Sequence, residues 1–356
     1  MRSARAIRII RGSHASDPVN FIVGPLIGRG VGGIRVEIHE PANVLSTMLL
    51  ALGGLPKDSK PHPLAAAAFR HVRPFRDHPS LEWLREFYRP PDLANLYGHA
   101  AQLAGPVSFA PRSSAVPPPL DAYEPARMKE LPARMAAFYE DAKLGTFRRA
   151  HTAPYTLAAA DVKDAIKGAR IESFLVDLYG LPRYALLVVP VPTHPRSGRG
   201  TSATTSWEDI AFLHPPRVAL RSASPVAWGL DPRATQVLVQ HELSHSLARE
   251  AIRWQDDLLP RVSAVLPTIP PESRLARAHP EPEQQLVELF ILGSTVSYFR
   301  RTRGDEEAQR WMATEVRRQG TPLIRDFFRA IEEFLGGRRW SDLHAFLGDL
   351  PKVLGA

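Results

Sequence analysis

Residues 231–249 read DPRATQVLVQHELSHSLAR, and the fold prediction starts from this stretch. Asp231 is a favourable N-cap and Pro232 follows it at the first helical position, so the segment has the signature of a helix start. The residues that continue one helical face are Ala234, Val237, Leu238, His241, His245 and Ala248. The pattern predicts a helix over residues 232–252 whose inward face carries both histidines.

This predicted helix contains an HExxH motif, formed by His241, Glu242 and His245. Two histidines four positions apart lie one turn above each other with Cβ atoms about 6 Å apart, so both imidazoles can reach one metal ion. Glu242 leaves the helix about 100° around the axis, where its carboxylate can act on a water without binding the ion. Gln236, Gln240 and Arg249 are expected to lie off the inward face. The alternative is a core helix with two hydrogen-bonded histidines.

The third ligand of such a site must come from later in the chain. Catalytic zinc typically has three protein ligands and a water, and this chain has no cysteine, so histidines and carboxylates must supply all three. The extended pattern HExxHxxGxxH is excluded because Ala248 and Ala251 stand where it requires glycine and histidine. The candidates are Glu272, His279, Glu281, Glu283 and Glu288.

Glu288 is the favoured third ligand. It lies within LVELFIL (286–292), where an unpaired carboxylate would be costly to bury and a metal ion would be a suitable partner. Glu283 falls in the first turn of a predicted helix, where the helix dipole stabilises a carboxylate without any ligand. The alternative for Glu288 is a buried ion pair with an arginine, and Glu283 and His279 stay open as ligands.

Composition and charge exclude several classes of protein. The 356 residues are 44% hydrophobic and 23% charged, as in ordinary globular proteins. The lack of cysteine excludes disulfides, cysteine metal sites and thiol nucleophiles. The balance of 45 basic and 37 acidic residues gives a net charge of +8, a mild field for this length, so no nucleic-acid partner is expected.

The sequence as given shows neither a signal peptide nor an apolar stretch long enough to span a bilayer. We therefore expect a cytoplasmic protein without a membrane span, and export stays open if a leader precedes residue 1. The sequence carries no signal for an oligomeric state.

Hydrophobic periodicity predicts an α+β fold that is predominantly α-helical, with a small sheet just before the HExxH helix. Strands are expected at 33–39, 184–192, 209–214 and 217–220. The polar segment 194–206 is expected to be a mobile surface loop, and the alternative is a loop that covers a cleft or binds an acidic group through Arg196 and Arg199. Further helices are expected at 42–53, 63–72, 79–88, 92–104, 126–148, 160–178, 281–301, 305–318, 321–335 and 340–348.

The chain divides by composition into three parts. Residues 1–110 form an N-terminal region with a short strand and helices. Residues 111–125, PRSSAVPPPLDAYEP, have the composition of a Pro-rich linker. Residues 126–356 are expected to form a catalytic region, which includes strands between 184 and 220, the HExxH helix and the helix that carries Glu288.

HELSHS (241–246), followed by ELFILGSTVSYFRR (288–301), resembles the gluzincin-type zinc metallopeptidases, and more specifically a bacterial family catalogued only as a domain of unknown function. Three further stretches are similar to that family: VEIHEPANVLSTMLLALGG (36–54), FRHVRPFRDHP (69–79) and YALLVVPVPT (184–193). The resemblance covers most of residues 34–301. It implies a zincin-like core and peptidase activity, with Zn²⁺ bound by His241, His245 and Glu288 and with Glu242 as the base. Leu292 stands where the gluzincin pattern has a second acid, so support for the histidine ligands must come from elsewhere.

The expected reaction is hydrolysis of a peptide or protein substrate by a metal-activated water. A second electrophile is needed, and its candidates are Tyr179, Tyr184, His194 and Tyr298. The strand at 184–192 either pairs with the substrate at a sheet edge or is a central core strand. The alternative functions are a non-catalytic metal-binding or protein-interaction module on the same fold, and a metal hydrolase acting on a non-peptide amide.

Overall fold

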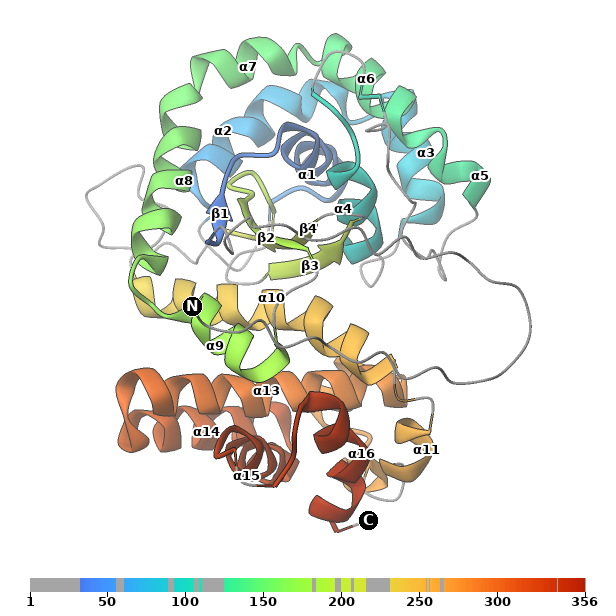
Figure 1. Cartoon of the computed structure of the whole chain (residues 1–356). Helices are drawn as coiled ribbons and strands as arrows, with labels where there is room; N and C mark the ends of the chain where they lie inside the picture. The colour runs from blue at the N-terminus through green and yellow to red at the C-terminus, as the bar shows by residue number, and fades with distance from the viewer. Residues whose placement is uncertain are drawn as a thin grey trace, which may run out of the picture. The chain divides into compact units, whose positions relative to one another are not determined.

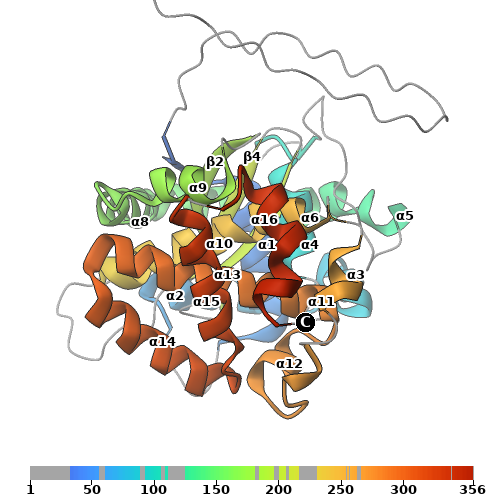
Figure 2. The same cartoon turned by 60° about the horizontal axis from the view of Figure 1, so that its bottom comes forward.

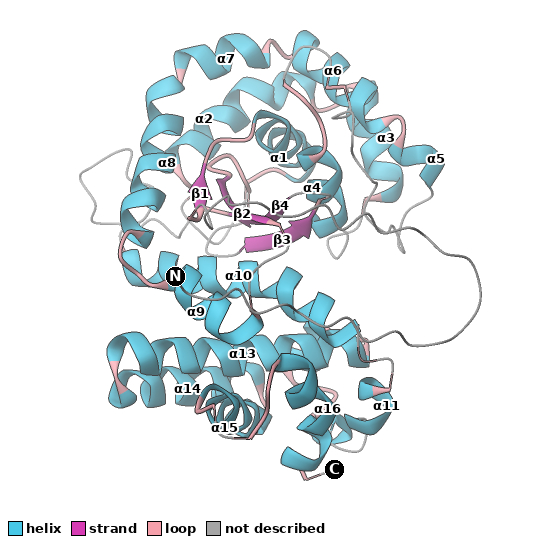
Figure 3. Ribbon diagram, viewed as in Figure 1, coloured by secondary structure: helices cyan, strands magenta, loops and turns pink. Residues whose placement is uncertain are grey.

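The computed structural model describes residues 33–55, 61–88, 93–105, 109–110, 125–180, 184–195, 200–205, 208–215, 231–253, 255, 257–262, 266–337 and 339–355. The chain divides into two units, Met1–Gly32 and Gly33–Ala356, and all described residues belong to the second. In this unit, helices enclose a four-stranded mixed sheet (Figures 1 and 3). The predicted α+β class with a predominance of helix is thus confirmed.

The sheet consists of β1 (Arg35–Val36), β2 (Ala185–Pro190), β3 (Gly200–Thr204) and β4 (Glu208–Leu213), in the spatial order β1-β2-β4-β3. β1 and β4 both pair with β2 in parallel, whereas β3 pairs with β4 in the antiparallel direction, with Gly200 opposite Leu213. The sequence left two alternatives open for this strand, pairing with the substrate at a sheet edge or a central place in the core. The structure shows the second, because β2 lies between β1 and β4. β3 is an edge strand of the described sheet.

Side chains alternate between the two faces of β2 and β4, as a fully covered sheet requires. Leu187, Val189 and Phe212 pack on one face against α1 (Glu40–Gly53), α4 (Leu93–Ala101) and α6 (Leu131–Asp141). Leu186, Val188 and Leu213 pack on the other face against α8 (Thr152–Ile166), α9 (Ile171–Tyr179) and α10 (Pro232–Arg253). One side of α10 therefore packs against the sheet.

A helical layer covers the opposite side of α10 (Figures 1 and 2). Its central member is α13 (Pro282–Arg303), which packs against α10, α14 (Asp305–Gln319) and α15 (Leu323–Leu335). The remaining helices are α2 (Pro63–Val72), α3 (Pro79–Phe87), α5 (Pro125–Met128), α7 (Leu144–Ala150), α11 (Leu258–Val262), α12 (Arg274–Ala278) and α16 (Leu343–Val353), with 3-10 turns at Arg73–Phe75 and Leu266–Thr268.

Three helices of the N-terminal half begin at a histidine followed within two residues by proline. His39, His62 and His78 cap α1, α2 and α3, and each side chain accepts a hydrogen bond from a backbone N–H of the first turn. Proline lies at the start of each helix, where its missing N–H costs nothing. These local signals explain why the predicted boundaries of the three helices agree with the structure to within two residues.

Several predicted elements differ from the structure. The predicted loop 194–206 contains strand β3, because an edge strand exposed on one side can be built from the polar and small residues that mark loops. The strand predicted at 33–39 is reduced to two residues. The helix predicted at 126–148 is broken into α5, α6 and α7, the one predicted at 160–178 is two helices, and the short α11 and α12 were not predicted.

Other predictions fall outside the described residues, namely the linker residues 111–124, Arg196 and Arg199, and the strand at 217–220. β1 precedes this linker in the chain and β2 follows it, and both belong to one sheet. No helix among the described residues is both long and apolar enough to cross a bilayer.

Candidate metal centre

α10 carries the HExxH motif and begins as the sequence indicates. The Asp231 side chain accepts a hydrogen bond of 2.8 Å from the backbone N–H of Arg233, and Pro232 is the first helical residue. The sheet covers one side of the helix and α13 the other, so α10 is buried over much of its length. Packing on both sides therefore holds in place the backbone that carries His241 and His245.

α13 runs antiparallel to α10, and four contacts define the register. Near one end, Arg253 donates to Glu283 over 3.0 Å; at the other, Arg303 donates to Gln236 over 2.6 Å. Between them, the fully buried Gln240 donates to Ser294 and accepts a 2.8 Å hydrogen bond from Thr295. The expectation that Gln240 lies off the inward face was wrong, because α13 covers that side too. In this register, His241 and His245 on α10 lie opposite Glu288 on α13.

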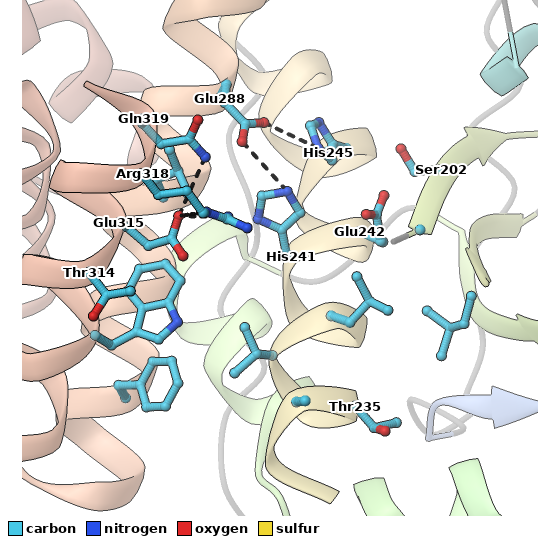
Figure 4. A pocket seen from close by; sticks show the side chains of 18 of the residues that line it. Ser202, Thr235, His241, Glu242, His245, Glu288, Thr314, Glu315, Arg318 and Gln319 are labelled. Atoms are coloured by element: carbon cyan, nitrogen blue, oxygen red, sulfur yellow. Dashed lines mark hydrogen bonds and ion pairs between the residues drawn. The ribbon is translucent and has the colours of Figure 1, made fainter. Parts of the chain in front are cut away.

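His241, His245 and Glu288 form the candidate metal centre (Figure 4). Nε2 of His241 lies 3.8 Å from Oε1 of Glu288, and Nε2 of His245 lies 3.5 Å from its Oε2. One ligand atom from each of the three residues lies within 4.8 Å of the other two. The two imidazole rings stand nearly perpendicular, with centroids 4.9 Å apart.

The donor set fits a divalent metal ion. Two imidazole nitrogens and one carboxylate are a common ligand set of catalytic zinc, and tetrahedral bonds of about 2.0–2.2 Å place ligand atoms about 3.3–3.6 Å apart. The distances between Glu288 and the two histidines are close to that spacing, so small side-chain rotations suffice. These three residues can therefore bind a metal ion.

Glu242 lies on another side of α10 from the ligand group, facing Ser202 of β3 (Figure 4). Glu242 is 6% exposed, and a Cβ placed on Gly200 would stand 2.5 Å from its Cγ. Only a residue without a side chain leaves room for Glu242 at this point of β3. Sequence reasoning placed Gly200 in a loop and gave this residue itself no role in the site.

Burial shifts the pKa values of the site. It lowers the pKa of His241 to about 4, with a further contribution from the positive charge of Arg318. It also lowers the pKa of His245, an effect that the charges of His241, Arg249 and His279 increase. Both imidazoles are therefore neutral near pH 7, the state in which they bind metals.

The two acidic residues are shifted in the opposite direction. Burial and the negative charge of Glu288 raise the pKa of Glu242 to about 8. Burial raises the pKa of Glu288 too, although the charges of His279, Arg318 and Arg274 oppose this shift. Two carboxyl groups buried so close together favour either protonation or a bound cation. The electrostatics of the pocket are therefore complementary to a metal ion.

The other candidate ligands are placed as follows. Glu283 accepts from Arg253, and Glu272 and Glu281 are exposed and do not line the pocket. Nε2 of His279 lies 3.8 Å from Oε2 of Glu288. The structure therefore brings Glu288 to the histidine pair and places His279 beside Glu288.

The ligand group lines a pocket of about 940 Å³, a volume suited to a ligand of several residues or a small molecule. None of the four predicted electrophiles, Tyr179, Tyr184, His194 and Tyr298, is among the described residues that line it. The hydroxyl of Tyr298 donates instead to the carbonyl of Ala169. His214 and Arg318 do line the pocket, and sequence reasoning missed both.

The sequence held a weak signal for His214 and none for Arg318. His214 directly follows the apolar strand β4, a position where functional side chains often lie in sheets with parallel strands. Its ring stacks on that of His194, with centroids 3.4 Å apart. Arg318 lies on α14, is paired with the buried Glu315, and reaches the site only through the packing of α14 against α13 (Figure 4).

Comparison of the chain with protein-family models, with curated protein sequences and with solved structures gave no match in any of the three.

Proposed function

We propose that this chain is a zinc-dependent metallopeptidase with a zincin-like core. The observation that carries the proposal is the convergence of His241, His245 and Glu288 from two antiparallel helices, with Glu242 one residue after the first histidine. A purely structural metal site is closed by protein ligands, whereas three ligands in an open pocket leave a position for water and substrate. The pocket supports a catalytic site over a structural one.

The roles of the residues follow from their chemistry. When bound, zinc would supply Lewis-acid chemistry, lowering the pKa of a water to about 7 and polarising the scissile carbonyl. Glu242 accepts the proton of the attacking water and returns it to the leaving amine. A carboxylate whose pKa is raised by burial and lowered again by a nearby cation can perform both transfers near neutral pH.

β3 supports a peptide as the substrate. It is the edge strand on the side of the sheet where Glu242 lies, and Gly200, Thr201 and Ser202 line the pocket. A peptide can extend a sheet edge through main-chain hydrogen bonds, which bind many sequences with a similar geometry. In this proposal, the scissile bond of such a peptide lies between Glu242 and the ligand group.

The test compares wild-type protein with Glu242→Gln, each reconstituted with zinc. Metal content is measured by mass spectrometry, and hydrolysis is measured on a mixed peptide library and on non-peptide amides. We expect one zinc per chain in both proteins and at least a 100-fold loss of peptide hydrolysis in the variant. Equal residual activity in both would refute the catalytic assignment and favour a non-catalytic metal-binding module. Hydrolysis of only the non-peptide amides would refute the substrate assignment.

A further inference from the structure

Six arginines line the pocket that contains the ligand group, and they differ in their partners. Four of them have an acidic partner: Arg233 and Arg303 pair with Glu307, Arg310 with Glu306, and Arg318 with Glu315. Arg249 and Arg274 form neither an ion pair nor a hydrogen bond within the part of the chain that the structure describes. Two guanidinium groups of this pocket are therefore available to a ligand.

Both of these arginines lie close to the candidate metal centre. Arg249 follows His245 by one turn of α10 and lines the same pocket as His241 and His245, so the expectation that it lies off their face was wrong. Arg274 is the first residue of α12, and its positive charge acts on Glu288. His279 directly follows this helix, and its Nε2 lies 3.8 Å from Oε2 of Glu288. Arg249 and Arg274 thus approach from two different helices, one beside His245 and the other beside Glu288.

The charges in the pocket indicate which kind of ligand Arg249 and Arg274 would bind. A divalent cation in the centre would be balanced by Glu242 and Glu288. Glu288, the carboxylate on which the charge of Arg274 acts, would then be shared with the metal, and Arg249 would keep only the charge of Glu283, which is already paired with Arg253. Arg249 is also four positions from Arg253 on α10, a repulsive spacing for like charges, but Arg253 is paired with Glu283. An anionic group in the pocket would offset both free charges at once.

Arg277 shows that an arginine on α12 does not necessarily line the pocket. It lies on α12 three residues after Arg274 and is exposed, as Arg274 is, but only Arg274 lines the pocket. Arginine on this short helix therefore occurs both inside and outside the pocket, and only Arg274 can meet a ligand bound at the metal centre. Arg277 provides a matched control.

We propose that Arg249 and Arg274 bind a carboxylate of the substrate beside the metal centre. The guanidinium fork matches the two oxygens of a carboxylate and donates charge-assisted hydrogen bonds to both. The carboxylate comes either from the free C-terminus of a peptide or from an Asp or Glu side chain near the scissile bond. The proposal rests on the proposed function and specifies its substrate class, peptides with a negative charge close to the bond that is cut.

The experiment measures binding separately from turnover. Zinc-loaded Glu242→Gln protein is immobilised, and random hexapeptide pools are captured on it and quantified by mass spectrometry. One pool lacks Asp and Glu and ends in a free carboxylate, a second contains Asp and Glu but ends in an amide, and a third lacks both kinds of carboxylate. Each capture is repeated with Arg249→Gln, Arg274→Gln and Arg277→Gln added to the background.

We expect about tenfold or greater capture of one carboxylate-bearing pool over the neutral pool, since hydrogen bonds to charged groups are the strong ones. Preference for the first pool identifies the terminal carboxylate, and preference for the second identifies a side chain. Arg249→Gln and Arg274→Gln should each abolish most of the preference, and Arg277→Gln should keep it. Equal capture of all three pools, or the same loss in Arg277→Gln, overturns the proposal.

Cleavage of the same pools by the wild-type protein tests the proposed peptidase function separately from the carboxylate site. If no pool is cleaved but the arginine-dependent capture persists, the proposed peptidase function fails and the carboxylate site stands. If the pools are cleaved without any charge preference in capture, the carboxylate site fails and the peptidase function stands.

Discussion

Gly200 at the start of β3 lies directly against the side chain of Glu242 on α10, and a Cβ at position 200 would stand 2.5 Å from Cγ of Glu242. A distance this short is a clash, so β3 and the proposed base can approach each other only because residue 200 has no side chain. This contact links the edge strand of the sheet to the HExxH helix. It also makes the position of Glu242 sensitive to a single methyl group.

We predict that Gly200→Ala reduces hydrolysis about 100-fold while the protein keeps its zinc. The new methyl group displaces the flexible Glu242 side chain, and a shift of about 1 Å in a reacting group can cost two orders of magnitude in rate. Steady-state kinetics and metal content check this. Gly53→Ala is the control, because a Cβ there meets no atom within 4 Å. Undiminished hydrolysis by Gly200→Ala would show that Glu242 need not keep this position.

Glu288→Gln and Glu283→Gln should differ strongly in metal affinity. Loss of the charged oxygen of Glu288 beside His241 and His245 should weaken zinc binding at least 100-fold, whereas Glu283 lies in a partly exposed ion pair with Arg253. Competition with a zinc chelator of known affinity gives both values. Equal affinity in the two variants would show that Glu288 is not a ligand.

The metal-free protein should lose stability as the pH rises from 6.5 to 8. Glu242 keeps its proton in the folded state up to about pH 8 but loses it near pH 4.5 when unfolded, so over this window the folded state binds more protons and stability falls with pH. The lowered histidine pKa values act only below pH 6.5. Glu242→Gln should flatten the slope and stabilise the metal-free protein at pH 8 by about 2–4 kcal/mol.

Denaturant unfolding at several pH values in the presence of a chelator measures this effect. Zinc should reduce the slope in the wild-type protein, because a nearby cation lowers the pKa of Glu242. Stability that rises between pH 6.5 and 8 in the metal-free wild type would contradict the prediction.

Gln240→Leu should destabilise the fold by about 1–3 kcal/mol, because it removes the buried hydrogen bonds that Gln240 makes with Ser294 and Thr295. Since these bonds join α10 to α13, zinc affinity should fall as well. A double-mutant cycle with Thr295→Val isolates the direct interaction, and we expect a coupling of about 0.5–3 kcal/mol. Additive effects of the two substitutions would show that the hydrogen bond does not join the helices energetically.

Much of the local structure around the candidate site could be predicted from the sequence. The N-cap Asp231, Pro232 and the spacing of apolar residues are local signals, and the predicted helix 232–252 matches α10 to within one residue. The spacing of His241 and His245 places both side chains on one turn in any helix. β3 was missed because its polar residues carry no strand pattern of their own, and only pairing with β4 makes them a strand.

Residue types and helical geometry alone imply that two histidines can share one metal ion and that no thiol can join them. Which carboxylate meets the histidines was decided by the tertiary structure. The antiparallel register of α10 and α13 brings Glu288 to His245 and sends Glu283 to Arg253. The tertiary structure also decided that Gly200 touches Glu242 and that Arg274, unlike Arg277, lines the pocket. These relations depend on packing between elements far apart in the chain, and no short-range pattern encodes such contacts.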